Sequence, residues 1–325
     1  MVAVAVPCVQ SAFGQADMLP VSRTAGVVTV DLSRGKATLL SLSNQKIIAN
    51  GRVTATGVGS LTLTSSPSAL PDLVSTPHAV KVVSRTKQLG ANAYGLSARI
   101  TSQNGQELTA SLPTNPEVGD ECIVYTLSTI ASLFGDTNSI GLNAASTPAT
   151  ADIVYISNAG ALTAIFYHSG VGKWRLVGDV NGSDQNNTVI PPDSGVLVAR
   201  KNSGPQSIFL PLRGDALPGR HAIQVSPGLT IANYPFALPT TLGSSGIRNH
   251  VNGGTGAGAA DVVYLENNGV LTGYFYKTGG VGGIGWRALG DSVTDRSSVA
   301  INPGKAILFK EQSGAAGFAI PEPFN

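Results

Sequence analysis

Apolar and polar positions alternate with a period of two in short segments along the first third of the chain. The segments are rich in Val, Thr and Ile and are flanked by Gly or turn residues: they are residues 26–31, 52–56, 60–64, 79–83 and 96–100. β-Branched residues in this pattern favour half-buried strands, because successive side chains of a strand point to opposite faces. Gln103-Asn104-Gly105-Gln106 adds a hairpin-type turn. The pattern predicts one N-terminal β domain over residues 17–118.

A long internal similarity organises the rest of the chain. Residues 152–167 read DIVYISNAGALTAIFY and residues 261–276 read DVVYLENNGVLTGYFY, with nine of sixteen positions identical. Flanking matches extend the repeating unit to about 105–110 residues, and self-similarity at a fixed offset is typical of tandem domains. We therefore predict two β repeats, over residues 119–218 and 219–325.

The predicted fold class is all-β. In each repeat an apolar run meets Asn158-Ala159-Gly160 or Asn267-Asn268-Gly269 and a second alternating run follows, which is a strong hairpin signal. Gly or Pro interrupts nearly every helical window, and only residues 127–134 suit two turns of helix. We expect tandem β-sandwich or partial-barrel domains with an internal duplication.

The first residues favour export. Residues 1–16 are apolar and then small and polar, as at the end of a secretory signal, although Val2, Val4 and Val6 also alternate as a retained strand would. Besides Cys8 in this segment the chain contains only Cys122, so we expect no intramolecular disulfide and a buried Cys122. The predicted location is secreted or at the cell surface.

Charge and hydropathy exclude two classes of partner. Charged residues make up 12% of the chain, the formal net charge is +2, and Lys and Arg form no run. Such a chain has no electrostatic footprint for phosphate, so we expect no nucleic-acid partner. No stretch approaches the roughly 18 consecutive apolar residues of a membrane helix, so we expect no membrane span.

Two Trp-Arg pairs are the candidate ligand or assembly contacts. Trp174-Arg175 and Trp286-Arg287 occupy equivalent places in the two repeats, each near a tyrosine, Tyr167 or Tyr276. Exposed indoles would stack on a sugar ring, whereas buried indoles would anchor each repeat's core with the Arg stem covering them. We expect the second arrangement and keep the first as the alternative.

Sites for metals or catalysis are poorly supported. Asp179, Asn181 and Asp184 place oxygen ligands as the start of a calcium loop does, but the glycine is displaced and no glutamate closes the loop, so calcium is a weak possibility and we expect no cofactor. Gly290-Asp291-Ser292 resembles a short esterase block without a counterpart in the first repeat. The four histidines are scattered, and no carboxylate pair stands out. We expect no catalytic residues.

Several short motifs resemble a known group of proteins. They are the Val-Thr-Val strand at residues 28–30, Leu133-Phe134-Gly135, Ala-Asp-x-Val-Tyr at 151–155, the Trp-Arg pair and a Pro-x-x-Gly strand at 192–195. Together they are similar to an uncharacterised family of exported β-rich repeat proteins of verrucomicrobial-type bacteria, loosely over residues 20–320 and most closely over 119–212. The resemblance implies export and a bacterial origin and carries no activity.

These observations predict a non-enzymatic extracellular structural protein. Export, repetition and an edge-strand surface with few protecting charges favour a self-assembling homo-oligomer or polymer, as in a filament, sheath or surface layer. The alternative is a secreted carbohydrate- or surface-binding module, for which a glycan is the partner. A third hypothesis is a secreted hydrolase that uses Asp or Glu pairs at the domain junction.

Overall fold

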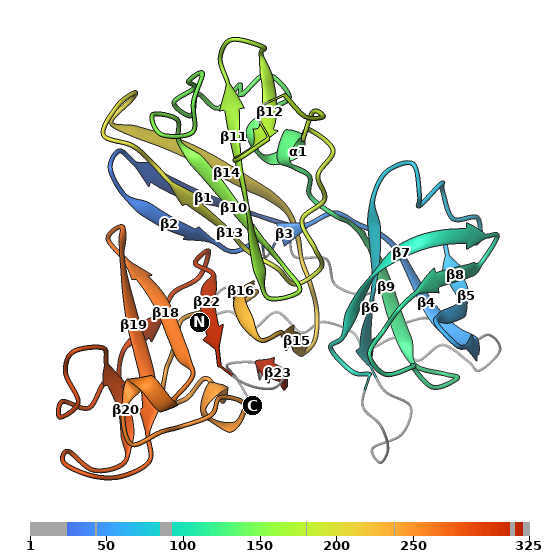
Figure 1. Ribbon diagram of the computed structural model, residues 1–325. Coiled ribbons are helices and arrows are strands. Elements are labelled where there is room, and N and C mark those ends of the chain that lie inside the picture. The colour runs from blue at the N-terminus through green and yellow to red at the C-terminus, as the bar shows by residue number, and fades with distance from the viewer. Residues whose placement is uncertain are drawn as a thin grey trace, which may run out of the picture.

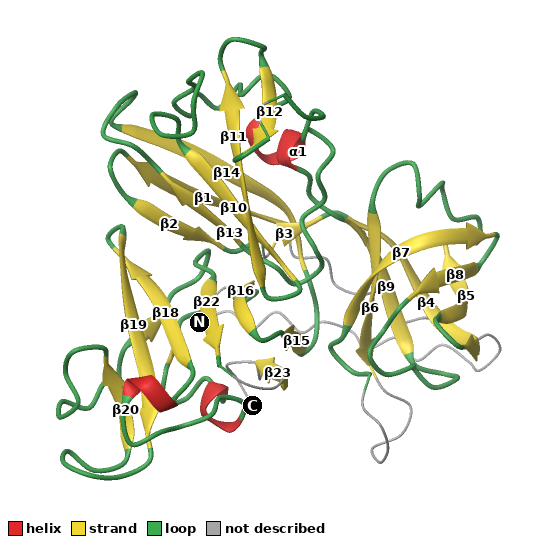
Figure 2. Cartoon of the chain, viewed as in Figure 1, coloured by secondary structure: helices red, strands yellow, loops and turns green. Residues whose placement is uncertain are grey.

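The computed structural model describes residues 25–42, 44–84, 93–179, 181–236, 238–312 and 316–320. Strands dominate this part of the chain, which confirms the all-β prediction (Figure 2). The helical turns described are α1 (Ile130–Phe134), η1 (Ile247–Asn249) and η2 (Ala257–Ala259), and no described helix is long and apolar enough to span a bilayer. The predicted signal or strand at residues 1–16 lies outside the described residues.

Six strands form a closed barrel over residues 47–126 (Figure 1). They close in the order β4-β5-β8-β7-β6-β9 and comprise β4 (Ile47–Gly57), β5 (Ser60–Ser66), β6 (His78–Ser84), β7 (Ser97–Asn104), β8 (Glu107–Ala110) and β9 (Glu121–Thr126). Val53, Leu63 and Val80 are among the residues that fill the interior, together with the free thiol of Cys122. The turn predicted at residues 103–106 joins β7 and β8: Asn104 pairs with Glu107, and Gly105, with a φ of 60°, lies in the loop between them.

A first sandwich unit combines residues 25–45 with residues 127–216. One sheet has the order β12-β11-β10-β13-β2 and contains β12 (Lys173–Leu176), β11 (Ala161–His168), β10 (Ile153–Asn158), β13 (Val196–Ala199) and β2 (Ala37–Leu40). The other has the order β1-β14-β3 and contains β1 (Ala25–Ser33), β14 (Ser207–Ala216) and β3 (Asn44–Gln45). Their inward side chains form one apolar core that also receives α1, whose first turn is capped by Thr129.

A second sandwich unit over residues 217–320 has a similar arrangement. Its main sheet has the order β16-β22-β18-β19-β20 and contains β16 (Gly228–Ala232), β22 (Ile307–Glu311), β18 (Val262–Asn267), β19 (Val270–Lys277) and β20 (Gly285–Ala288). Two short pairs complete it: β15 (His221–Val225) with β23 (Ala316–Ile320), and β17 (Thr240–Thr241) with β21 (Ala300–Ile301). The strand order of the main sheet corresponds to that of the first unit, with β16 in the place of β2.

Strand pairing groups the N-terminal residues differently from the predicted ranges. β1 pairs along its whole length with β14, and β2 pairs with β13, so residues 25–45 complete the first unit. The barrel starts only at Ile47 and continues through β9, beyond the predicted boundary at residue 118. The barrel is therefore an insertion within the first unit, because the chain leaves that unit after β3 and returns to it after β9.

The two predicted hairpins are present, with Ala159-Gly160 as the turn of the first and Asn268-Gly269 as the turn of the second. They join β10 to β11 and β18 to β19. Ala159 and Gly160 have φ values of 48° and 81°, and Asn268 and Gly269 have values of 51° and 79°. Two successive residues with positive φ match the twist of the flanking strands, which is why Asn and Gly recur in such turns.

The main sheets of the two units pack against each other with approximate two-fold symmetry. Backbone hydrogen bonds come in matched pairs across the interface: Ala37 N to Gly269 O with Leu229 N to Gly160 O, and Ala306 N to Leu39 O with Gly195 N to Ile231 O. Leu39, Ile231 and Leu308 are buried between the sheets. Each unit thus docks its β2 or β16 strand on the hairpin and sheet of the other, as in an isologous dimer.

Candidate functional site

Asp193 marks the first departure from this symmetry. It lies in the loop before β13 and has a φ of 56°, and the aligned residue of the second unit is Gly304, with a φ of 75°. Positive φ is uncommon for a residue with a β-carbon, although aspartate tolerates it better than most. Asp193 is also buried, at 8% exposure. The turn therefore holds a carboxylate where its counterpart holds no side chain.

Asp193 belongs to a buried polar cluster built from all three parts of the protein. Lys81 comes from β6 of the barrel and is 0% exposed, and His221 comes from β15 of the second unit and is 1% exposed. Lys81 Nζ lies 2.8 Å from His221 Nδ1. His221 Nδ1 lies 3.6 Å from Asp193 Oδ1. We call Lys81, Asp193 and His221 the junction cluster.

The environment of the cluster sets its protonation. Burial and the charge of Lys81 lower the pKa of His221 to about 4, so the imidazole is neutral at pH 7. Its Nδ1 then accepts a hydrogen bond from the Lys81 ammonium, and its Nε2–H faces the Leu217 carbonyl at 3.5 Å. Burial opposes ionisation of Asp193, whereas the nearby charge of Lys81 favours it, and the pKa of Asp193 is lowered. The cluster therefore holds a buried positive charge on Lys81 and a buried negative charge on Asp193, both next to His221.

The lowered pKa of His221 predicts acid sensitivity. Between about pH 6.5 and pH 4 the unfolded chain binds a proton at this histidine that the folded protein does not, so stability falls as the pH falls through this window. The expected loss is on the order of 3 kcal/mol. Urea unfolding at pH 7 and pH 4.5 measures it. In His221→Gln the difference between the two pH values should shrink by most of this amount, and an unchanged difference would contradict the assignment.

The other half of the pseudo-symmetric pair has no such cluster. A β-carbon added at Gly304 would lie 2.9 Å from Cγ1 of Val28 on β1, so an apolar side chain occupies the place that His221 takes beside Asp193. The polar side chains occur at the half against which the barrel packs Lys81. The cluster is therefore present only at the end of the two-unit interface against which the barrel packs.

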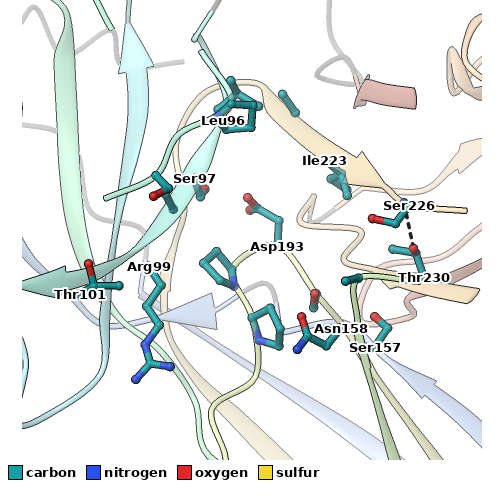
Figure 3. A pocket seen from close by; sticks show the side chains of 18 residues that line it. Leu96, Ser97, Arg99, Thr101, Ser157, Asn158, Asp193, Ile223, Ser226 and Thr230 are labelled. Atoms are coloured by element: carbon teal, nitrogen blue, oxygen red, sulfur yellow. Dashed lines mark hydrogen bonds between the residues drawn. The ribbon is translucent and has the colours of Figure 1, made fainter. Parts of the chain in front are cut away.

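A pocket of about 440 Å³ opens beside the cluster, between the barrel and both units (Figure 3). The β7 strand contributes Ser97, Arg99 and Thr101 on one side, and Asn158, Ser226 and Thr230 line the other. Asp193 lies between these walls, and Pro191 and Pro192 are adjacent to it in the lining. We call this the junction pocket. Its hydroxyl, amide and guanidinium groups suit hydrogen bonding to a polar solute.

The pseudo-symmetry places a second, charged pocket at the opposite end of the interface. Its volume is about 310 Å³, and its lining includes Lys36, Lys305, Glu266 and Asp31. Lys305 is paired with Glu266. The two pockets share their hairpin and loop positions, but no barrel residue lines the second one.

The predicted contact residues Trp174 and Trp286 are core residues. They are 0% and 1% exposed. Trp174 donates a hydrogen bond from Nε1 to the Gly135 carbonyl at 2.8 Å, and Tyr167 packs edge-on against it with ring centroids 5.4 Å apart. Tyr276 packs in the same way on Trp286, at 5.6 Å. Neither indole has a face open to a sugar ring.

The paired arginines do not cover the indoles. Neighbours on a strand point to opposite faces, so Arg175 and Arg287 lie on the other face from the tryptophans. Arg175 donates to the Gly182 carbonyl, and Arg287 donates to the Gly282 carbonyl and pairs with Asp295 at 3.1 Å. These side chains fasten loops to the sheet edge.

The weak calcium candidate gains no support from side-chain geometry. Asp179, Asn181 and Asp184 are exposed, and Asp184 pairs with Lys173 at 3.0 Å. Within the described residues no group of three His, Cys, Asp or Glu side chains is placed to hold a metal ion.

The junction cluster was not predicted from the sequence. Its residues stand far apart in the sequence, at positions 81, 193 and 221, and the spacing of the four histidines predicts no site. One local signal was present: where the repeats align, Asp193 replaces Gly304 in a turn. Where one repeat has glycine at a positive-φ position and the other has a polar residue, the polar side chain is expected to make a contact that offsets the backbone strain.

The chain matches no family model, no curated protein and no solved structure. The resemblance to exported bacterial β-repeat proteins therefore stays a prediction, and function is argued from the site and surfaces alone.

Proposed function

We propose that the protein is a non-enzymatic structural subunit of the cell exterior that associates with copies of itself. Low charge, export as predicted from residues 1–16, and the stacking of β units within the chain support this proposal. The observation that carries it is an exposed sheet face on β1 and β14.

The outer face of the β1–β14 pair is open and partly apolar. On β1 the outward residues are Val27, Thr29 and Asp31, and on β14 they are Phe209, Pro211 and Arg213; all six are exposed. Val27 is 61% and Phe209 66% exposed. Large apolar side chains grouped on a surface are typical of association sites.

The charges on this face complement a second copy. Asp31 stands opposite Phe209 in the strand register, and Arg213 stands opposite Val27, so the acidic and basic side chains occupy opposite ends of the face. A two-fold axis through the centre would bring Asp31 of each copy to Arg213 of the other, with Thr29 and Pro211 between them and Val27 and Phe209 at the other two corners of the face. β1 also pairs only with β14 among the described strands, which leaves its other edge open to strand addition.

Reversing one charge should block this association. Asp31→Lys places like charges at both ends of the two-fold contact, so we expect association to weaken about tenfold or more, as for an unfavourable charge pair. Sedimentation velocity over a concentration series, with negative-stain electron microscopy, measures it.

A matched reversal provides the control. Asp31→Lys combined with Arg213→Asp restores opposite charges and should restore association. Val58→Lys should leave association unchanged, because Val58 is fully exposed in the barrel hairpin between β4 and β5. A wild-type protein that stays monomeric at all concentrations, or a charge reversal without effect, would overturn the proposal.

A further inference from the structure

Arg99 supplies an available positive charge to the junction pocket. Its side chain is exposed on β7, lines the pocket, and makes no hydrogen bond or ion pair with another described residue. Arginine presents a planar set of donors that fits a carboxylate in bidentate fashion. This wall of the pocket therefore favours an anionic group.

The opposite wall favours hydroxyl groups. Asn158, Ser226 and Thr230 line it, and the Asn158 side chain has no hydrogen-bond partner among the described residues. Thr230 Oγ1 accepts from the Ser226 amide at 3.3 Å, which fixes the hydroxyl in the pocket wall (Figure 3). Hydroxyls and amides both donate and accept hydrogen bonds, as the hydroxyls of a sugar do.

The carboxylate between the walls does not cancel the charge of Arg99. Asp193 already has its counter-charge in Lys81, which the barrel places behind it through His221. An anion held by Arg99 therefore meets a pocket whose other charges are balanced. Pro191 and Pro192 add apolar ring surface of the kind that the C–H face of a sugar covers.

We propose that the junction pocket binds an acidic sugar, a uronate unit of a polysaccharide, with its carboxylate on Arg99 and its hydroxyls on Asn158 and Thr230. The volume of about 440 Å³ is within the range of small-ligand pockets, roughly 300–1,000 Å³. The site is separate from the buried indoles and from the β1–β14 face.

Titration with four small probes tests the proposal. We use D-glucuronate, D-glucose, acetate and D-galacturonate with the full chain, followed by chemical-shift changes or calorimetry. Glucuronate or galacturonate should bind at least about tenfold more tightly than glucose and acetate, because only the uronates engage both walls. Binding of acetate as tight as that of uronates would show a simple anion site and overturn the sugar assignment, as would the absence of uronate binding.

Two variants locate the bound sugar. Arg99→Gln should reduce the affinity for uronates to the affinity that the protein has for glucose. Thr230→Val should weaken the binding of the uronates and of glucose. Arg52→Gln, which removes an exposed barrel arginine that lies outside both the pocket and the β1–β14 face, is the matched control and should leave uronate binding unchanged. Uronate binding that persists in both pocket variants would place the ligand elsewhere. Thermal unfolding of each variant identifies any that fails to fold, and Ser226→Ala then replaces Thr230→Val.

Discussion

Asp193→Asn is expected to destabilise the protein by about 3 kcal/mol or more, although it changes one atom of one side chain. Asparagine tolerates the positive φ of this turn, so the backbone preference is retained. What disappears is the negative charge that faces the buried ammonium of Lys81 across His221. Burying a charge after its counter-charge is removed is far more costly than losing a pair in water.

Urea unfolding followed by tryptophan fluorescence measures this loss. Asp184→Asn is the control, because Asp184 forms an exposed pair with Lys173 and should cost less than about 1 kcal/mol. Adding Lys81→Met to Asp193→Asn should recover part of the lost stability, since both charges are then absent. Equal effects of the two Asp→Asn exchanges would show that the junction cluster contributes nothing beyond a surface pair.

Replacing Trp174 with alanine is expected to cost about 3–5 kcal/mol, the usual range for a large buried aromatic side chain. The indole packs against Phe134 and Tyr167 at the centre of the first core, and its Nε1 binds the Gly135 carbonyl next to α1. Trp286→Ala should cost a similar amount through packing alone.

Phenylalanine at the two positions separates packing from hydrogen bonding. Trp174→Phe loses the bond to Gly135, whereas Nε1 of Trp286 has no hydrogen-bond partner among the described residues. We therefore expect Trp174→Phe to be more destabilising than Trp286→Phe by about 1 kcal/mol. Thermal and urea unfolding of the two variants give the comparison, and an equal loss would mean that the Nε1 bond contributes no net stability.

The sequence was informative wherever structure is set by neighbours along the chain. Period-two patterns located strands, and Asn158-Ala159-Gly160 located a hairpin, because turn geometry restricts the residues that can form it. The sequence does not, however, show which strand another strand pairs with. Alternation in β1 indicates which face is buried, but it does not reveal that β1 pairs with β14 and not with the barrel strands that follow it.

The same limit explains the candidate site. The aromatic and arginine residues at 174–175 and 286–287 were visible as a repeated motif, and repetition here reflects a shared core. The junction cluster depends on side chains that only the fold brings together, from β6, a loop and β15. The difference between the repeats at Asp193 and Gly304 is the one sequence feature that marks the cluster.

The connections of the barrel have an architectural consequence. Thr126 N donates to Lys46 O at 2.9 Å, so the chain enters and leaves the barrel along two strands that are hydrogen-bonded neighbours. The barrel could be removed or exchanged without distorting the first unit, because the two chain ends that would have to be rejoined are about 4.8 Å apart, the spacing of paired strands. Here removal would also open one side of Asp193 and His221 to water. The barrel is therefore inserted through a simple connection, but the residues around Asp193 and His221 depend on the barrel being there.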